Sequence, residues 1–130
     1  MTRIVIFGAG LGGKRALNAL PPEVTAIAFC DNCPALHGRK ICGLPVVDPA
    51  HLFELDLDYV LIASSYFDEI FDQLIAFGFP IERIEVLDPE VRNGNEESAH
   101  VRWLAFTIFS AGVASLVFLA SYGTYYLLFG

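Results

Sequence analysis

Charge is absent from the C-terminal end of this sequence. Residues 103–130 contain no Asp, Glu, Lys or Arg, so the 8 basic and 15 acidic side chains of the 130-residue chain all precede them. About 20 consecutive apolar residues are enough to cross the roughly 30 Å hydrocarbon core of a bilayer. This absence excludes residues 103–130 from an ordinary water-soluble domain and predicts one transmembrane helix there.

Basic residues are scarce in the rest of the chain. The net charge of −7 belongs entirely to residues 1–102. Nucleic-acid binding depends largely on cationic contacts to phosphate, and anionic lipid surfaces attract clusters of Lys and Arg. The acidic balance therefore argues against a nucleic-acid partner, and it leaves membrane attachment to the apolar C-terminal segment.

Cysteine is also rare, and no secretory signal pattern opens the sequence. The three cysteines are Cys30, Cys33 and Cys42. An odd number without such a signal predicts reduced thiols in a cytosolic compartment. A structural zinc ion needs four ligands, and His37 would have to be the fourth while Cys30 ends a buried strand. We therefore expect small buried cysteines and no metal site.

Apolar runs alternate with helical patterns over the first 87 residues. Strands are predicted at 3–7, 25–30, 59–64 and 84–87, with a brief extended piece from Leu44. Helices are predicted at 11–20, from near Pro49 with Asp48 as the N-cap, and at 67–77, and a polar loop at 31–43. Alternation of this kind, with strands apolar on both faces, is typical of a parallel sheet covered by helices on both sides. The predicted fold is a minimal Rossmann-like α/β domain of four or five strands over residues 1–88. A polar linker over 89–102 and the transmembrane helix over 103–130 follow it.

Glycines follow the first predicted strand directly. Gly8, Gly10 and Gly13 satisfy G-x-G-x-x-G, with a strand before and a helix after. In such turns the first glycine permits the tight turn, the second lets a pyrophosphate approach the backbone, and the third allows close packing of helix and strand. Asp31, about 20 residues further on, follows the second strand, where an acidic side chain can hold a ribose hydroxyl. The pattern predicts a nucleotide site; the alternative is a turn that closes the first βαβ unit and binds nothing.

Other polar residues stand at the same predicted edge of the sheet. Lys14 and Arg15 follow the last glycine, within reach of a phosphate, and the amides of that helix start favour an anion. Ser64 and Ser65 follow the third strong strand, where ligands of open parallel sheets bind. Ser64 is a candidate ligand contact, although we favour a simpler function for this pair, with Ser65 as the N-cap of the next helix. No spacing indicates a catalytic triad or dyad, so no catalytic residue is predicted.

Three blocks of this sequence resemble a known group of domains. "FGAGLGGKRAL", "AFCDNCPALHGRKICGLPVVDP" and "DYVLIASS" are similar to the Rossmann-like nucleotide-sugar-binding domains of bacterial polysaccharide-biosynthesis proteins. These include the N-terminal domains of sugar acetyltransferases and related domains of membrane-bound nucleotide-sugar dehydratases and sugar transferases. The resemblance covers about residues 3–88. It implies that Gly10, Lys14, Asp31 and Asn32 line a site for a nucleotide or nucleotide-sugar.

The sequence departs from that group after residue 88. The similar proteins continue into hexapeptide β-helix repeats, a second Rossmann domain or a basic catalytic domain, and none of these follows here. A binding domain without its usual catalytic partner predicts that this chain is not an enzyme by itself.

The apolar segment has the features of a membrane helix that packs against others. Trp103 and a cluster of tyrosines bracket it as an aromatic belt does, and every basic residue precedes it. The positive-inside rule then predicts a single pass through the inner (cytoplasmic) membrane, with the N-terminal domain in the cytoplasm. Ser110 and Ala114, like Ala111 and Ser115, are small residues four positions apart, which lets helices approach closely. We expect contacts with transmembrane helices of a larger complex; the alternative is a plain anchor.

Three hypotheses for function follow. The first is a membrane-anchored cytoplasmic subunit that binds a nucleotide or nucleotide-sugar, with nucleotide-sugar or NAD(P) as possible ligands. The second is a non-catalytic accessory subunit of a larger membrane complex, bioenergetic or photosynthetic included, with a vestigial ligand site. The third, an NAD(P)-dependent enzyme, is the least favoured, because no acid, base or substrate domain is visible.

Overall fold

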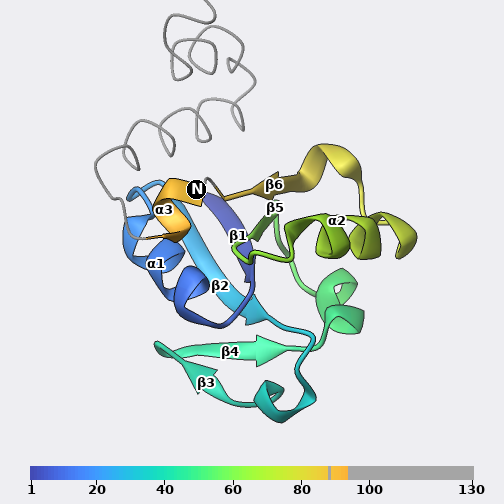
Figure 1. The fold of residues 1–130 in the computed structure, drawn as a ribbon, viewed down its shortest axis with the longest axis horizontal. Coiled ribbons are helices and arrows are strands. Elements are labelled where there is room, and N and C mark those ends of the chain that lie inside the picture. The colour runs from blue at the N-terminus through green and yellow to red at the C-terminus, as the bar shows by residue number, and fades with distance from the viewer. Residues whose placement is uncertain (88, 94–130) are drawn as a thin grey trace, which may run out of the picture.

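The computed structural model describes residues 1–87 and 89–93 of the chain. Within them, six strands form one sheet in the order β3-β4-β2-β1-β5-β6 (Figure 1). The strands are β1 (Thr2–Phe7), β2 (Val24–Cys30), β3 (Lys40–Ile41), β4 (Leu44–Val47), β5 (Tyr59–Ile62) and β6 (Ile84–Val86). The helices are α1 (Leu11–Ala19), α2 (Phe67–Ala76) and α3 (Pro89–Arg92), with 3-10 turns η1 (Pro34–Leu36), η2 (Pro49–Glu54) and η3 (Ile81–Arg83).

The sheet is parallel except at one edge. β4, β2, β1, β5 and β6 run parallel to one another, whereas β3 pairs antiparallel with β4. The predicted α/β domain with a largely parallel sheet is thus confirmed, but the described residues form six strands where four or five were predicted. β4 falls on the predicted extended piece, whereas β3 and its antiparallel pairing were not predicted and β3 lies in the expected polar loop. The turn between β3 and β4 is made by Cys42 and Gly43, whose φ angles of 53° and 79° are those that tight hairpins require. A two-residue strand is too short to produce a periodic signal.

Helices pack on both faces of the sheet, and each face has its own core. In β1, Ile4 and Ile6 point to the core under α1, while Val5 and Phe7 point to the core under α2 and η2. All four side chains are at most 1% exposed. Because successive strand residues point to opposite faces, two buried faces require the nearly continuous apolar runs seen in the sequence. Figure 1 shows α1 and α2 on opposite sides of β1.

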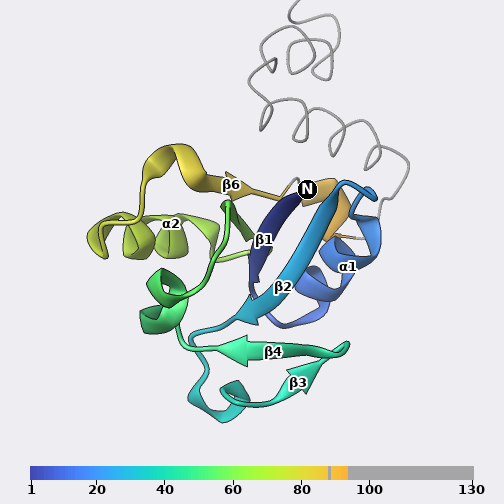
Figure 2. The same ribbon diagram turned by 180° about the vertical axis from the view of Figure 1, so that it is seen from behind.

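The chain reverses its direction of travel across the sheet at β1. β2 and β4 lie on one side of β1, and β5 and β6 lie on the other, as the opposite view in Figure 2 also shows. Phe7, the last residue of β1, is in register with Cys30 of β2 and Ile62 of β5. The carboxyl ends of the central strands therefore end at one level. In open parallel sheets such a reversal leaves a crevice where ligands bind.

The helix expected near Pro49 is a 3-10 helix, η2. Asp48 is its N-cap, as predicted, and the Asp48 carboxylate accepts from the Ala50 backbone N–H at 2.9 Å. The segment extends only six residues, to Glu54. A 3-10 helix of this length is enough to bury Leu52 beneath the α2 face, where its side chain is 1% exposed.

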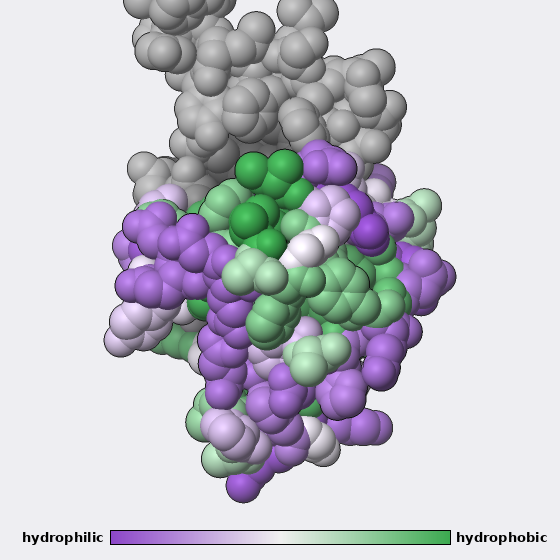
Figure 3. All heavy atoms as spheres, turned by 90° about the vertical axis from the view of Figure 1, so that its right-hand side faces the viewer, coloured by the Kyte–Doolittle hydropathy of each residue, from purple (hydrophilic) through white to green (hydrophobic). Residues whose placement is uncertain are grey.

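One face of the domain carries large apolar side chains that remain exposed. Ile75 and Phe77 near the end of α2 are 40% and 45% exposed, and Phe53 of η2 and Ile81 of η3 are 56% and 60% exposed. The space-filling view from the α2 side shows an apolar area bordered by polar residues (Figure 3). Exposed apolar areas of this kind are typical of surfaces that contact another protein or a membrane.

The C-terminal predictions fall largely outside the described part of the chain. The transmembrane helix predicted over 103–130, with Ser110, Ala111, Ala114 and Ser115, lies there, as do residues 94–102 of the predicted linker. The first linker residues form α3. None of the helices within residues 1–87 and 89–93 has the length and apolar character to cross a membrane.

Candidate functional site at the glycine turn

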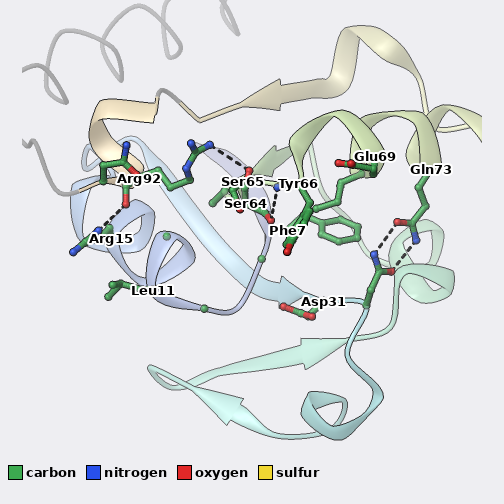
Figure 4. Close-up of a pocket in the computed structure, with 17 residues that line it drawn as sticks. Phe7, Leu11, Arg15, Asp31, Ser64, Ser65, Tyr66, Glu69, Gln73 and Arg92 are labelled. Carbon is green, nitrogen blue, oxygen red and sulfur yellow. Dashed lines mark hydrogen bonds between the residues drawn. The ribbon is translucent and has the colours of Figure 1, made fainter.

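A cavity of about 700 Å³ lies where the chain reverses across the sheet. It is lined by the glycine turn after β1, the loop after β2, the loop after β5, the first turns of α2, and α3. In Figure 4, Arg15 and Arg92 stand at one end, Gln73 stands at the other, and Asp31 lies below. Its position beyond the carboxyl ends of β1 and β5 is the one predicted from the sequence for a ligand site.

The three glycines of the motif have different surroundings. Gly8 has a φ of 120°, and a Cβ there would lie 3.0 Å from the Ala63 carbonyl oxygen. A Cβ at Gly13 would lie 1.8 Å from the Gly8 carbonyl oxygen. A Cβ at Gly10 would meet nothing within 4 Å, and Gly10 lines the cavity. Gly8 and Gly13 are thus required by the turn itself. Gly10 leaves open space in which a ligand can approach the protein backbone.

Gly12 is a fourth glycine with a different constraint. A Cβ at this position would lie 2.6 Å from the Ala63 carbonyl oxygen and 2.8 Å from Cγ of Arg92. Contacts shorter than 3.0 Å are essentially never made by real Cβ atoms. The absence of a side chain at Gly12 therefore makes room for both the β5 end and α3.

Asp31 holds the glycine turn in place. Its Oδ2 accepts from the Ala9 backbone N–H at 2.9 Å, and its Oδ1 accepts from the Cys33 backbone N–H at 2.9 Å. The Asp31 carbonyl in turn contacts Nε2 of His37 at 2.6 Å. A carboxylate can accept about four hydrogen bonds, so these two contacts leave capacity for a hydroxyl. The structure shows Asp31 organising the turn; its contact with a ribose is still a prediction.

Asn32 pairs with a residue that the sequence did not point to. Its side-chain amide exchanges two hydrogen bonds with that of Gln73, at 2.9 and 2.8 Å, and both residues line the cavity. The pair joins the loop after β2 to α2. Gln73 lies 41 residues away from Asn32 along the chain and mid-helix, so no local pattern marks it.

Ser64 lines the cavity, but the predicted N-cap at Ser65 is wrong. The N-cap position of α2 is Tyr66, which makes no side-chain cap bond. The Ser64 hydroxyl instead accepts from the Tyr66 backbone N–H at 3.1 Å. A serine hydroxyl that accepts from the backbone N–H two residues ahead forms a local turn. The Tyr66 N–H is paired in this way without a side-chain cap on α2.

The cations at the cavity are Arg15 and Arg92. Arg15 lines the cavity, whereas Lys14 is exposed and lies outside its lining. The contact of Lys14 with a phosphate stays a prediction. Nη1 of Arg15 donates to the Arg92 carbonyl at 2.9 Å, and Nη1 of Arg92 donates to the Ser64 carbonyl at 3.3 Å. Arg92 falls in the predicted polar linker, and no short-range sequence pattern relates it to the glycine turn.

The Cys30 thiol, at the end of β2, is buried. Burial, followed by the charges of Asp31 and Asp48, raises the pKa of Cys30 well above its usual value, so the thiol stays protonated at neutral pH. Cys33 and Cys42 are exposed, so the expectation of buried cysteines is wrong for these two and holds for Cys30 alone. Among residues 1–87 and 89–93, no three His, Cys, Asp or Glu side chains gather in a way that could hold a metal ion.

Sequence comparison gives a family and one curated relative. Residues 1–85 match the family model described as C2185-like, N-terminal. The UDP-N-acetylmuramoylalanine–D-glutamate ligase of Mycolicibacterium smegmatis is 34% identical over 64 residues, which are 48% of this chain and 13% of the ligase. The match thus spans only a small part of that enzyme.

Structural comparison gives the fold. The UDP-D-quinovosamine 4-dehydrogenase of Vibrio fischeri matches with a TM-score of 0.55 and 24% identity, over 72% of this chain and 84% of that chain. The protein RSP, in complex with β-NAD+ and operator DNA, matches with a TM-score of 0.51 and 15% identity, over 85% and 60%. The resemblance inferred from sequence is supported at the level of a Rossmann-like fold. With residues 1–85 covered by its model, the chain belongs to the C2185-like, N-terminal family.

Proposed function

We propose that this chain is a nucleotide- or nucleotide-sugar-binding subunit without a catalytic domain of its own. Residues 1–88 lie in the cytoplasm in this proposal, and residues 103–130 hold them at the inner (cytoplasmic) membrane. The observation that carries the proposal is the cavity at the glycine turn, where open space at Gly10 adjoins the start of α1 and two arginines. Helix starts and guanidinium groups both favour phosphate.

The size of the cavity supports a ligand of this class. About 700 Å³ falls within the range of roughly 300–1,000 Å³ that is usual for small-molecule sites. The polar groups are also suitably spread: arginines flank the turn, and the Asn32–Gln73 pair stands at the far end (Figure 4). A diphosphate at the arginine end would place the remainder of a nucleotide along the cavity.

The names of the similar proteins support the same class of ligand. The ligase of M. smegmatis and the dehydrogenase of V. fischeri are each named for a UDP-linked sugar derivative, and RSP was solved with β-NAD+. UDP-sugars and NAD both carry a pyrophosphate between sugars. A glycine turn that cradles a pyrophosphate would serve either one.

The hydrogen bonds at the cavity favour binding over catalysis. The Asp31 carboxylate accepts from two backbone amides, and the Ser64 hydroxyl accepts from a third. Groups engaged in this way hold the loops in position. A general base needs a free lone pair directed at a proton of the substrate. The hydrogen bonds given for the Asp31 carboxylate and the Ser64 hydroxyl are all to backbone amides of their own loops.

The exposed apolar area around Phe77 favours a second candidate, an accessory subunit of a larger membrane complex. Phe77, Ile81 and Phe53 would be covered by a partner in such a complex. The transmembrane contacts proposed for Ser110 and Ser115, with their neighbours Ala111 and Ala114, would add to that interface. In this second candidate the glycine turn need not be occupied.

Native purification tests the proposal. The full chain is extracted in a mild detergent, and small molecules released on denaturation are identified by mass spectrometry together with co-purifying chains. The proposal expects a nucleotide or nucleotide-sugar in the parent and much less of it in Gly10→Val. A chain that is empty, and that stays empty after incubation with UDP-sugars and NAD+, would contradict the proposal and leave the accessory-subunit candidate.

A further inference from the structure

The short helix α3 closes one side of the cavity. It follows β6 and spans Pro89–Arg92, and it packs against α1 beside the glycine turn. It is also the last helix before residue 94, so it connects the nucleotide site to the segment that leads to residues 103–130. A four-residue helix has little stability of its own, so its position depends on the contacts that it makes.

Two hydrogen bonds fix Arg92 across the cavity. Arg15 of α1 donates to the Arg92 carbonyl at 2.9 Å. Nη1 of the Arg92 side chain donates to the Ser64 carbonyl, just beyond β5, at 3.3 Å. Arg92 therefore joins α1 to the end of β5, the two elements that border the crevice (Figure 4).

The glycine turn is shaped to accept this side chain. A Cβ on Gly12 would lie 2.8 Å from Cγ of Arg92, so any other residue at position 12 would displace the Arg92 stem. Gly12 is not one of the three glycines that the nucleotide motif requires, which are Gly8, Gly10 and Gly13. The Ala63 carbonyl oxygen would be closer still, at 2.6 Å, so Gly12 makes room for the end of β5 and for the Arg92 side chain together.

Arg92 adds positive charge beside the start of α1, where the helix dipole already favours an anion. Arg92 and Arg15 are both half-buried, and both line the cavity on the side of the α1 start. A guanidinium carries five N–H donors in a planar fork, which suits the oxygens of a phosphate. The Ser64 carbonyl accepts from one of them at a long distance of 3.3 Å, a contact that a charged oxygen can readily replace or extend.

We propose that Arg92 contacts the phosphate of the bound nucleotide, so that filling the cavity and docking α3 favour each other. This inference rests on the proposed function and extends it: ligand occupancy is transmitted through α3 to the segment that follows. By linkage, a ligand that tightens α3 docking by some factor is itself bound more tightly by the same factor. Nucleotide binding and the docking of α3 are thereby coupled at this site.

Titration of Arg92 variants tests the contact. UDP and NAD+ are titrated by calorimetry into the detergent-purified full chain, into Arg92→Gln and into Arg92→Lys. We expect Arg92→Gln to weaken binding at least tenfold, and Arg92→Lys to weaken it less, because Lys keeps the charge and loses the fork. Arg39→Gln is the matched control: Arg39 is exposed and lies outside the cavity, so the same loss of charge should change affinity less than twofold.

Hydrogen exchange tests the coupling. The Asn93 backbone N–H donates to the Pro89 carbonyl at 2.9 Å, so its exchange rate reports on α3. A saturating nucleotide should slow exchange of the peptide covering residues 89–93 at least threefold in the parent and not in Arg92→Gln. Exchange of the β1 peptide should be equal in both chains, which verifies that Arg92→Gln is folded.

The outcomes separate this inference from the proposed function. If the parent binds UDP or NAD+ and Arg92→Gln binds it equally well or more tightly, Arg92 is a spectator or an obstruction and this inference alone fails. If affinity falls but exchange over 89–93 does not respond to ligand, the coupling is wrong. If the parent binds neither UDP nor NAD+, this inference fails, and the proposed function fails with it when UDP-N-acetylglucosamine is not bound either.

Discussion

The Asp31 carboxylate lies 2.9 Å from the backbone nitrogen of Ala9, so the end of β2 is tied to the glycine turn. Ala9 is 3% exposed, and its N–H points away from bulk water. A buried N–H that loses its acceptor costs about 1–3 kcal/mol. Asp31 therefore stabilises the turn whether or not a ligand is bound.

Removal of the Asp31 carboxylate should destabilise the chain. We expect Asp31→Ala to lower the free energy of unfolding by about 1–3 kcal/mol, because both the Ala9 and the Cys33 amides lose their partner. The control is Asp56→Ala, which breaks an exposed ion pair with Arg3 that should contribute less than about 1 kcal/mol. Urea unfolding of the full chain in detergent provides the comparison, and equal losses for both variants would remove the role given to Asp31.

Two glycine positions should respond oppositely to alanine. Gly13→Ala places a Cβ 1.8 Å from the Gly8 carbonyl oxygen, a backbone atom that cannot yield without moving the turn. We expect it to cost more than about 3 kcal/mol or to prevent folding, since milder overpacking already costs about 1–3 kcal/mol. Gly10→Ala meets nothing within 4 Å, and its stability should change by less than about 1 kcal/mol. Thermal unfolding of the two variants checks this, and a tolerant Gly13 would contradict the described packing of α1.

The free energy of unfolding should decrease as the pH rises, because of Glu85 on β6. Burial raises the pKa of Glu85 from 4.5 to about 7. Between these values the folded chain holds a proton that the unfolded chain has lost, so the free energy of unfolding decreases as the pH rises through this window, by at most about 3 kcal/mol. Below pH 4.5 both states are protonated, and above pH 7 both are ionised, so Glu85 adds no slope there.

The variant Glu85→Gln isolates this effect. Its unfolding free energy, measured from pH 4 to 8 beside the parent, should lack the component due to Glu85, and above pH 7 it should exceed that of the parent. Other acidic groups titrate in both chains and cancel in the difference. A difference curve that is flat across pH 4.5–7 would show that Glu85 ionises normally.

The predicted membrane helix can be tested by its small residues. Ala111→Leu with Ser115→Leu keeps residues 103–130 apolar, so membrane insertion should be unaffected. Close approach to a partner helix should be blocked, and co-purification of the partner should decrease. Retention of the partner in full would make the segment a tether only.

Truncation before residue 103 tests the domain boundary. The β6 strand ends at Val86, and Leu87 is 4% exposed in the core under α1, so the sheet is complete before the linker. We expect residues 1–102 to give a folded acidic domain without detergent, judged by circular dichroism and gel filtration. Insolubility of the truncated chain, when the full chain extracts cleanly, would show that the two parts are not independent.

The fold was predictable because its signals are local. The apolar runs that became β1, β2, β5 and β6, and the glycine turn between β1 and α1, each follow from short-range patterns. β3 and its pairing with β4 were missed because a two-residue strand with Lys40 at an exposed edge has no apolar period. The helix expected near Pro49 could not be identified as a 3-10 helix from the sequence, because an N-cap residue followed by proline can begin an α-helix or a 3-10 helix.

Only part of the cavity lining was predictable, because the rest depends on contacts between residues far apart in the sequence. Gly8, Gly10, Asp31, Asn32 and Ser64 directly follow strand ends, and topology alone brings those ends together. Gln73 reaches the cavity from the middle of α2, where it pairs with Asn32. Arg92 reaches it from α3, 77 positions after Arg15. No short-range pattern relates either residue to the turn. Long-range hydrogen bonds therefore determine the part of the lining that sequence could not supply.

The most direct test of the central claim is calorimetric titration of UDP, UDP-N-acetylglucosamine and NAD+ into the parent chain and Gly10→Val. Gly10→Val places a branched side chain in the open space at the turn, where its Cβ meets nothing within 4 Å apart from its chain neighbours, so it should leave the fold intact. Ala35→Val, an exposed change in η1 outside the cavity, is the control. We predict saturable binding of at least one of the three by the parent and by Ala35→Val, weakened at least tenfold, about 1.4 kcal/mol, in Gly10→Val. Binding that Gly10→Val leaves unchanged, or no binding by the parent, would contradict a nucleotide site at the glycine turn.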